Sequence, residues 1–129
     1  MTRGKGFRPG QVVWVPNVPD RNGNAKPTPR PLLVIQPGAI SQQSPLCCLC
    51  ISTDPKDDPQ DPAMEMPWDP GTGSTTGLFE WCRVVLLWHV VVDQAKVLKR
   101  SGSVNSAFLA DVAIRREQAE LARLGRGKK

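Results

Sequence analysis

Arg30 has a proline on each side, at positions 29 and 31. Proline fixes its own φ angle and restricts the residue before it, so this guanidinium leaves from a stiff stretch of backbone. Arginine stays ionised and offers a planar fork of N–H donors, which suits the negative charge that builds on phosphoryl oxygens during phosphate transfer. We therefore take Arg30 as the first catalytic candidate. A surface arginine paired with a carboxylate is the alternative interpretation.

Two hydroxyl side chains, Ser52 and Thr53, follow an apolar run that ends at Ile51. A hydroxyl at the end of a strand can donate to a phosphoryl oxygen and hold the reacting group in position. The same residues precede Asp54-Pro55, where serine and threonine also favour a turn. Both are catalytic candidates, and the sequence leaves the choice between them open.

The group that would accept a proton is harder to find. His89 is the only histidine, but it lies within the apolar run Leu86–Val92, where a buried structural histidine is the more ordinary interpretation. Single-stranded nucleic acid bases stack on exposed indole rings, and one tryptophan falls in a proline-rich loop. Trp68 by its ring, and Asp20 and Lys26 by their charge in the first long loop, are therefore candidates for substrate contact.

The net charge of the chain is +5, and it is unevenly spread. Residues 1–30 hold six Lys/Arg and one acid, and residues 93–129 hold nine Lys/Arg and four acids. Between them, residues 54–69 hold one Lys and six acids. This pattern suits a surface that attracts phosphate in one place and repels it in another, although an ordinary charged surface with a basic tail would also produce it.

The four cysteines are Cys47, Cys48, Cys50 and Cys82. Their spacing matches no common zinc motif, so we expect no metal site and no cofactor. The first residues are basic and Gly-rich without the apolar segment of a signal peptide, which predicts a reducing, cytoplasmic location and free thiols buried in a strand. No apolar run is long enough to cross a bilayer, so we expect no membrane association.

Thirteen prolines and eleven glycines among 129 residues indicate short elements and many turns. Apolar, β-branched runs predict strands over residues 11–15, 31–36, 46–52 and 63–66. The run 78–92 is too long for one straight strand, so we expect a break near 86–88 and a further strand around 94–99. The segment 102–105 opens a helix with Asn105 as its N-cap, and this helix is expected to end before Gly125.

This order predicts a mainly β protein, a small antiparallel barrel or strongly curved sheet of five to seven strands with a C-terminal α-helix. We expect a flexible basic N-terminus over residues 1–9, one domain over 10–124 and a basic tail over 125–129.

The motifs also occur in a recognisable order. The pattern G-x-V-x-W-V spans Gly10–Val15, and R-P-x-x-V-I spans Arg30–Ile35 after a polar loop with Lys26. There follow a strand that ends in Ser52-Thr53, a Thr-Gly-Leu turn at 76–78 and a Gly-Ser-Val-Asn helix start at 102–105. From about residue 10 to residue 121 the chain resembles the PemK/MazF (Kid) family of toxins of type II toxin–antitoxin systems.

The resemblance implies an SH3-like barrel that forms a homodimer, cleaves single-stranded RNA without a metal, arrests growth and is inhibited by a cognate antitoxin. It also implies that Arg30 acts together with the hydroxyl of Ser52 or Thr53. The sequence departs from the family at the acid that follows the Thr-Gly turn, because that position falls on Cys82 or Trp81. The resemblance therefore makes the nearby Glu80 and Arg83 candidates to substitute for it in contacting RNA. Two alternatives follow: a non-catalytic barrel that binds a protein target, as CcdB toxins do, or a degenerate member without nuclease activity.

Overall fold

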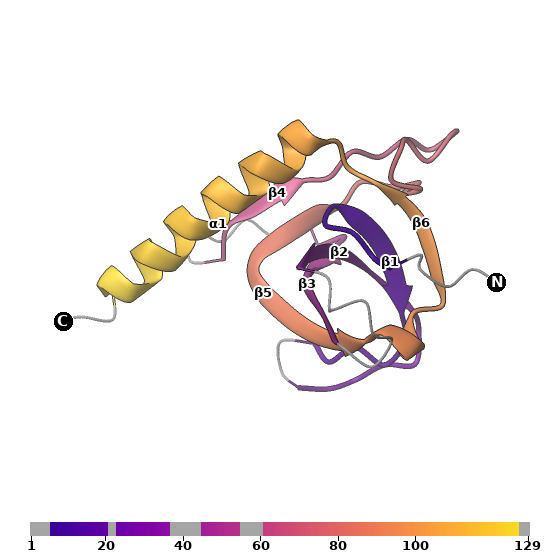
Figure 1. Ribbon diagram of the computed structural model, residues 1–129, viewed down its shortest axis with the longest axis horizontal. Coiled ribbons are helices and arrows are strands. Elements are labelled where there is room, and N and C mark those ends of the chain that lie inside the picture. The colour runs from indigo at the N-terminus through magenta and orange to yellow at the C-terminus, as the bar shows by residue number, and fades with distance from the viewer. Residues whose placement is uncertain (1–5, 21–22, 37–44, 55–60, 127–129) are drawn as a thin grey trace.

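The computed structural model describes residues 6–20, 23–36, 45–54 and 61–126. Its strands form one antiparallel sheet in the order β4-β5-β3-β2-β1-β6, and the sheet curves strongly upon itself (Figure 1). The strands are β1 (Gln11–Val15), β2 (Arg30–Gln36), β3 (Pro45–Ser52), β4 (Ala63–Glu65), β5 (Arg83–Asp93) and β6 (Lys99–Ser103). With the helix α1 (Ser106–Arg126), they confirm the predicted mainly β, barrel-like fold.

β5 is the strand that bends the sheet. It pairs with β3 along its length, but the register shifts between Leu49, which is opposite His89, and Ile51, which is opposite Val84. The extra residues of β5 at this point form a bulge, which turns a strand sharply without ending it. The break expected near 86–88 is therefore a bulge inside one strand, and the strand begins at Arg83 rather than at Leu78.

Both faces of the sheet are buried over β2, as the unbroken apolar run of this strand requires. On one face, Leu33 packs with Leu49, Ile51 and other buried side chains beneath α1 and the loop before β5. On the other face, Leu32 and Val34 pack inside the curve of the sheet.

The helix begins as predicted and ends later than predicted. Asn105 Oδ1 accepts a hydrogen bond from the backbone N–H of Phe108 at 2.7 Å, which confirms the N-cap. Val112 is buried against the sheet, whereas the end of the helix extends past the sheet (Figure 1). The helix runs through Gly125 to Arg126, so the expected end before Gly125 was wrong. Glycine lowers helix propensity by only about 1 kcal/mol, which does not by itself end a helix.

The segment after β5 also differs from the expectation. Gln94–Lys96 forms a 3₁₀ turn, with Asp93 Oδ1 accepting from the N–H of Ala95, and the strand expected at 94–99 is instead β6 at Lys99–Ser103. The first two residues of the expected helix start, Gly102 and Ser103, therefore belong to this strand.

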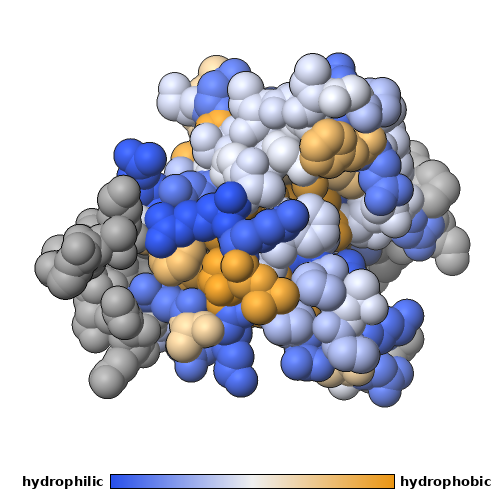
Figure 2. All heavy atoms as spheres, turned by 90° about the vertical axis from the view of Figure 1, so that its right-hand side faces the viewer, coloured by the Kyte–Doolittle hydropathy of each residue, from blue (hydrophilic) through white to orange (hydrophobic). Residues whose placement is uncertain are grey.

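β6 is an edge strand that carries two exposed cations, Lys99 and Arg100. Charged side chains on an edge hinder pairing with another chain. Figure 2 shows the face on this side of the molecule, where a band of hydrophilic residues lies beside a hydrophobic patch. The Arg100 guanidinium lies 3.9 Å from the centre of the Phe7 ring, so one apolar group on this side is capped by a cation.

The cysteines are free thiols, as predicted. Cys48, Cys50 and Cys82 are buried and Cys47 is half-buried. Burial raises the pKa of Cys48 to about 12, and the neighbouring Cys47 and Cys50 contribute to the rise, so this thiol stays protonated at neutral pH.

Candidate active site

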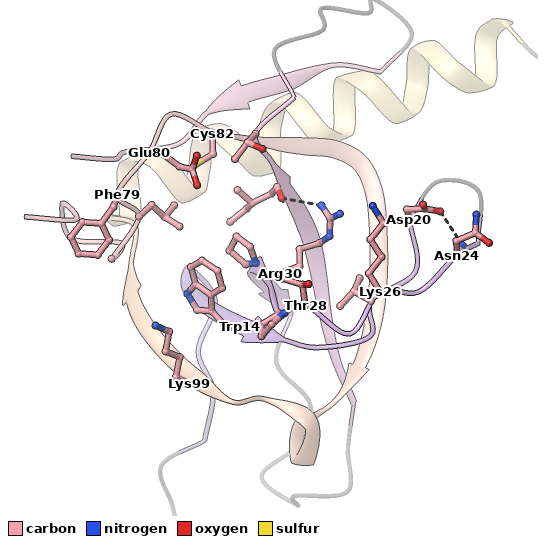
Figure 3. A pocket seen from close by; sticks show the side chains of 17 residues that line it. Trp14, Asp20, Asn24, Lys26, Thr28, Arg30, Phe79, Glu80, Cys82 and Lys99 are labelled. Carbon is pink, nitrogen blue, oxygen red and sulfur yellow. Dashed lines mark hydrogen bonds between the residues drawn. The ribbon is translucent and has the colours of Figure 1, made fainter. Parts of the chain in front are cut away.

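A pocket of about 700 Å³ opens where three segments meet: the loop before β2, the end of β3 and the loop before β5 (Figure 3). Of the residues that the sequence singled out, it brings together Asp20, Lys26, Arg30, Thr53 and Glu80. These residues come from distant parts of the chain, so the sheet is what assembles the site.

Arg30 is the first residue of β2 and pairs with Val15 of β1, which fixes its backbone in addition to the two prolines. Its Nη1 donates to the carbonyl oxygen of Ile51 at 3.4 Å, and its guanidinium carbon lies 4.8 Å from the centre of the Trp88 ring. None of the described carboxylates forms an ion pair with it. The pocket therefore contains a half-buried, oriented cation that no described acid neutralises.

The structure separates the two candidate hydroxyls. Ser52 Oγ accepts a hydrogen bond from the backbone N–H of Asp54 at 3.0 Å, which is the turn-forming role that serine often takes. Thr53 lines the pocket with Arg30, and Ser52 does not. Geometry thus favours Thr53 as the hydroxyl that faces a ligand.

The loop before β2 is ordered by a small turn of its own. Asp20 Oδ1 accepts from the backbone N–H of Asn24 at 3.0 Å (Figure 3). Pro19 also forms an antiparallel β-bridge with Ala25. The carboxylate of Asp20 is thus used to shape the loop. The same turn brings Lys26 into the pocket wall, where its ammonium adds to the positive charge of Arg30.

The loop before β5 is anchored through Thr76, whose side chain is fully buried. Its Oγ1 donates to the carbonyl of Pro67 at 2.7 Å, and its own carbonyl accepts from Ser101 Oγ at 2.7 Å. Ser101 Oγ in turn accepts from Trp14 Nε1 at 2.9 Å. Gly77 has a positive φ of 75°, and a Cβ there would overlap the carbonyl oxygen of Ser101. Strands β1 and β6 therefore hold this loop in close contact.

Glu80 and Cys82 face the pocket from the end of this loop (Figure 3). Burial raises the pKa of Cys82 to about 11, and the carboxylates of Glu80 and Glu65 contribute to the rise. A thiol that is neutral at pH 7 is a poor proton acceptor. Glu80 is exposed to the pocket, and no described residue forms a hydrogen bond or an ion pair with it, so its carboxylate is the better acceptor.

Two other predicted contact residues lie outside the pocket lining. Arg83 is half-buried, with its guanidinium carbon 5.9 Å from the centre of the Trp81 ring. Trp68 is partly buried against the core and donates through Nε1 to Glu65 at 3.0 Å, so its ring is less open than its loop position suggested.

His89 is exposed rather than buried, because the bulge in β5 places it on the face beneath α1. Partial desolvation and the nearby charge of Arg116 lower its pKa, while Glu120 acts in the opposite direction. A separate groove of about 420 Å³ between α1 and the sheet contains it, so it takes no part in the Arg30 pocket.

The sequence did not point to several residues that line the pocket or support it. Phe79 and Lys99 line it on the side of β6, and Trp88 supports Arg30 from β5. The only local sign that Phe79 lines the site is its position directly after the Thr-Gly-Leu turn. Lys99 and Trp88 reach the site through the curvature of the sheet, which no local pattern reveals.

Within the described residues, no group of three or more His, Cys, Asp or Glu side chains is placed to hold a metal ion. No helix among them has the length and apolar character needed to cross a membrane.

Comparison with known families agrees with this architecture. The sequence profile that matches residues 8–117 is that of the "PemK-like, MazF-like toxin of type II toxin-antitoxin system". The chain belongs to this toxin family. The match confirms the resemblance found in the sequence, and it covers β1 to β6 and the first half of α1.

Solved structures share the fold of this PemK/MazF-like toxin. One, a mycobacterial "endoribonuclease in complex with its cognate antitoxin", is 18% identical with a TM-score of 0.56, over 88% of this chain and 93% of that one. Another, a MazE-MazF complex from Deinococcus radiodurans, is 17% identical with a TM-score of 0.53, over 83% of this chain and 88% of that one. No curated protein matches the toxin by sequence.

Proposed function

We propose that this PemK/MazF-like toxin is an endoribonuclease that cleaves single-stranded RNA at the Arg30 pocket. The observation that carries the proposal is the Arg30 guanidinium, oriented by Ile51 and Trp88 and not neutralised by any described carboxylate. A solved structure with the same fold is named an endoribonuclease. The pocket adds a second cation, Lys26, and a hydroxyl, Thr53, which together suit a phosphodiester of RNA.

The reaction that fits these groups is attack of a ribose 2′-oxygen on the adjacent phosphorus. Negative charge builds on the non-bridging oxygens, where Arg30 donates hydrogen bonds and Thr53 orients the phosphate. The new bond joins the 2′-oxygen to phosphorus, and the bond from phosphorus to the 5′-oxygen breaks. The products are a 2′,3′-cyclic phosphate and a 5′-hydroxyl end.

Glu80 is the group in this pocket that would accept the proton of the 2′-hydroxyl. It faces the cavity without a described partner, whereas Asp20 is used in its loop and Cys82 is held as a neutral thiol. The departing 5′-oxygen takes a proton from solvent, since the pocket is open to water. No metal ion is required for either proton transfer in this scheme.

The partners follow from the same site. A cognate antitoxin with an acidic segment would cover Arg30 and Lys26 by charge complementarity. The toxin would act as a homodimer in the cytoplasm, where its RNA substrate is found and where its free cysteines stay reduced.

The first test is induction of the toxin in bacteria together with cleavage of a defined RNA by the purified protein. We expect wild type to arrest growth and leave 2′,3′-cyclic phosphate ends. Arg30→Ala should lower cleavage by about 100-fold or more, the usual effect of removing one transition-state donor. The control is Arg115→Ala, which removes an exposed arginine that pairs with Asp111 on α1.

The same assay distinguishes the two hydroxyls: Thr53→Val should slow cleavage, and Ser52→Ala should not. Equal cleavage by wild type and Arg30→Ala would contradict the proposal. Growth arrest without any RNA cleavage would favour a protein target of the CcdB type. If the wild-type toxin neither arrests growth nor cleaves RNA, it is a degenerate family member without nuclease activity.

A further inference from the structure

We propose that Phe79 forms a stacking subsite for one RNA base beside the phosphate that is cleaved. The inference rests on the proposed RNA cleavage and adds to it a specific contact on the substrate. The ligand at this subsite is a nucleobase, recognised by its flat aromatic face.

The pocket extends to both sides of Arg30. In Figure 3, Lys26 and Asp20 lie on one side of Arg30, and Phe79 and Lys99 lie on the other. A single phosphate at Arg30 would fill only the middle of a cavity of about 700 Å³. The strand of RNA must therefore continue in both directions, and one of its neighbouring nucleotides passes Phe79.

The Phe79 ring is exposed and lies against the chain along one edge. It is 57% exposed, although large aromatic side chains are seldom left so open. One edge of the ring lies against Gly73, where an added Cβ would come 2.9 Å from Phe79 Cζ. The contacts of Gly77 with Ser101 hold the loop itself. A ring that the chain contacts along one edge has less freedom to lose when a base stacks on its open side.

The other aromatic ring at this end of the pocket is occupied. Trp14 donates through Nε1 to Ser101, and Lys99 Nζ lies 5.2 Å from the centre of its ring. Trp14 therefore contributes to the wall, and its Lys99 neighbour presents a positive charge to the next phosphate of the strand. This leaves Phe79 as the ring at this end that is open to a base.

Phenylalanine has no hydrogen-bonding group, so the subsite would accept any of the four bases. Stacking on one aromatic side chain changes affinity by about tenfold or more on alanine substitution. Binding at Phe79 would then set the register of the strand, while the identity of the bases that are cut would depend on other contacts.

The test uses a short RNA whose cut site has been mapped with wild-type toxin, and a set in which each nucleotide in turn is abasic. For wild type, we expect one position next to the cut at which the abasic change raises KM by about tenfold. Phe79→Ala should raise KM for the intact RNA by a similar factor and should be insensitive to the abasic change at that position. Phe79→Trp should behave as wild type, and Phe79→Leu should behave as Phe79→Ala.

Val91→Ala is the control, because Val91 is 56% exposed on β5 and is not part of the pocket lining. Two results would overturn the subsite. In one, Phe79→Ala raises KM by the same factor at every abasic position; in the other, Phe79→Ala leaves KM unchanged. If wild type cuts no RNA, the proposed function fails, and the subsite is judged from Kd for fully 2′-O-methylated RNA. An equal Kd for wild type and Phe79→Ala would then overturn it.

Discussion

Arg30 is supported by a residue that is not its neighbour in the sheet. Trp88 belongs to β5, and β3 lies between β5 and β2. The Arg30 guanidinium nevertheless lies 4.8 Å from the centre of the Trp88 ring, while its Nη1 donates to the Ile51 carbonyl of β3. The indole covers one face of the guanidinium and leaves the N–H groups at its edge to point elsewhere.

Trp88 is thus a positioning residue for Arg30, and its removal tests this role. We expect Trp88→Leu to lower kcat by about three- to thirtyfold, the range that corresponds to a cation–π contact of roughly 0.5–2 kcal/mol. KM should change little, and Trp88→Phe should restore most of kcat. These constants are measured on a mapped RNA.

The matched control is Trp81→Leu, since Trp81 also stacks on an arginine, Arg83, but outside the pocket. A rise in KM without a fall in kcat in Trp88→Leu would mean that the indole binds RNA rather than aims Arg30. If kcat and thermal stability fall equally in both variants, the two indoles contribute only to packing.

At the scale of single residues, the sequence predicted those features of the site that depend on residues adjacent in the chain. The prolines beside Arg30 and the hydroxyls after β3 are local features, so both were found. The choice of Thr53 over Ser52 depends on which side of the strand end faces the pocket. Trp88 packs partly against the core, and nothing in the sequence shows that the bulge in β5 also places it beside Arg30.

The loop before β5 is the element that completes the site. It carries Phe79, Glu80 and Cys82, and it depends on its contact with β6 for its position. Asp69 begins the loop with a turn of its own, since its Oδ1 accepts from the N–H groups of Gly71 and Thr72 at 2.8 and 2.9 Å. These hydrogen bonds lower the pKa of Asp69, so the turn is held at neutral pH and weakens as acid protonates the carboxylate.

A methyl group at Gly77 should displace this loop. Gly77→Ala places a Cβ where the carbonyl of Ser101 lies and forces alanine to adopt a positive φ of 75°. We expect the free energy of unfolding to fall by roughly 1–3 kcal/mol and RNA cleavage to fall further than stability explains. Thermal melting and cleavage rates measured below the melting transition separate the two effects.

Gly125→Ala serves as the control, because nothing lies within 4 Å of a Cβ at that helical position. It should retain full cleavage and equal or higher stability. Wild-type cleavage in a destabilised Gly77→Ala would show that the loop does not need its contact with β6 in order to act.

Predictions of the strands were accurate where both ends had clear signals. β1 matches the prediction at both ends because Gly10 and Pro16 bound it. The residues after β5 have no such boundary, and here a 3₁₀ turn and an edge strand replaced the expected strand. Their placement depends on pairing with β1, in which Val13 lies opposite Arg100, and such long-range pairing has no local signature.

On the scale of the whole molecule, the described part of the toxin has large apolar side chains exposed on its helix. Ile114, Leu121 and Leu124 are 56%, 61% and 58% exposed. Their spacing of seven and three residues places them on one stripe of α1. Val112 points to the sheet, so this stripe faces away from the protein's own core. Large apolar side chains gathered on one exposed stripe are typical of an interaction surface.

We expect a second copy of the toxin to cover this stripe, with the two helices packed against each other. A glutamate at Leu121 would place an unpaired charge in that contact and should shift the protein from a dimer to a monomer of 14.1 kDa. Analytical ultracentrifugation over a range of concentrations measures the shift. Ala122→Glu is the control, because it adds the same charge one residue further along the exposed helix, roughly 100° around its axis.

The two variants also show how assembly is connected with catalysis. Arg30, Thr53 and Glu80 belong to the same chain, so we expect a monomeric Leu121→Glu toxin to retain Arg30-dependent cleavage of a short RNA. Longer RNA that spans both pockets of a dimer should be cut less efficiently by the monomer. In the dimer, binding at one pocket raises the effective concentration of the RNA at the other pocket, and the monomer lacks this effect. Loss of cleavage on short RNA in a folded monomer would mean instead that the partner contributes to the site. A dimer that persists in Leu121→Glu would exclude this stripe as the interface.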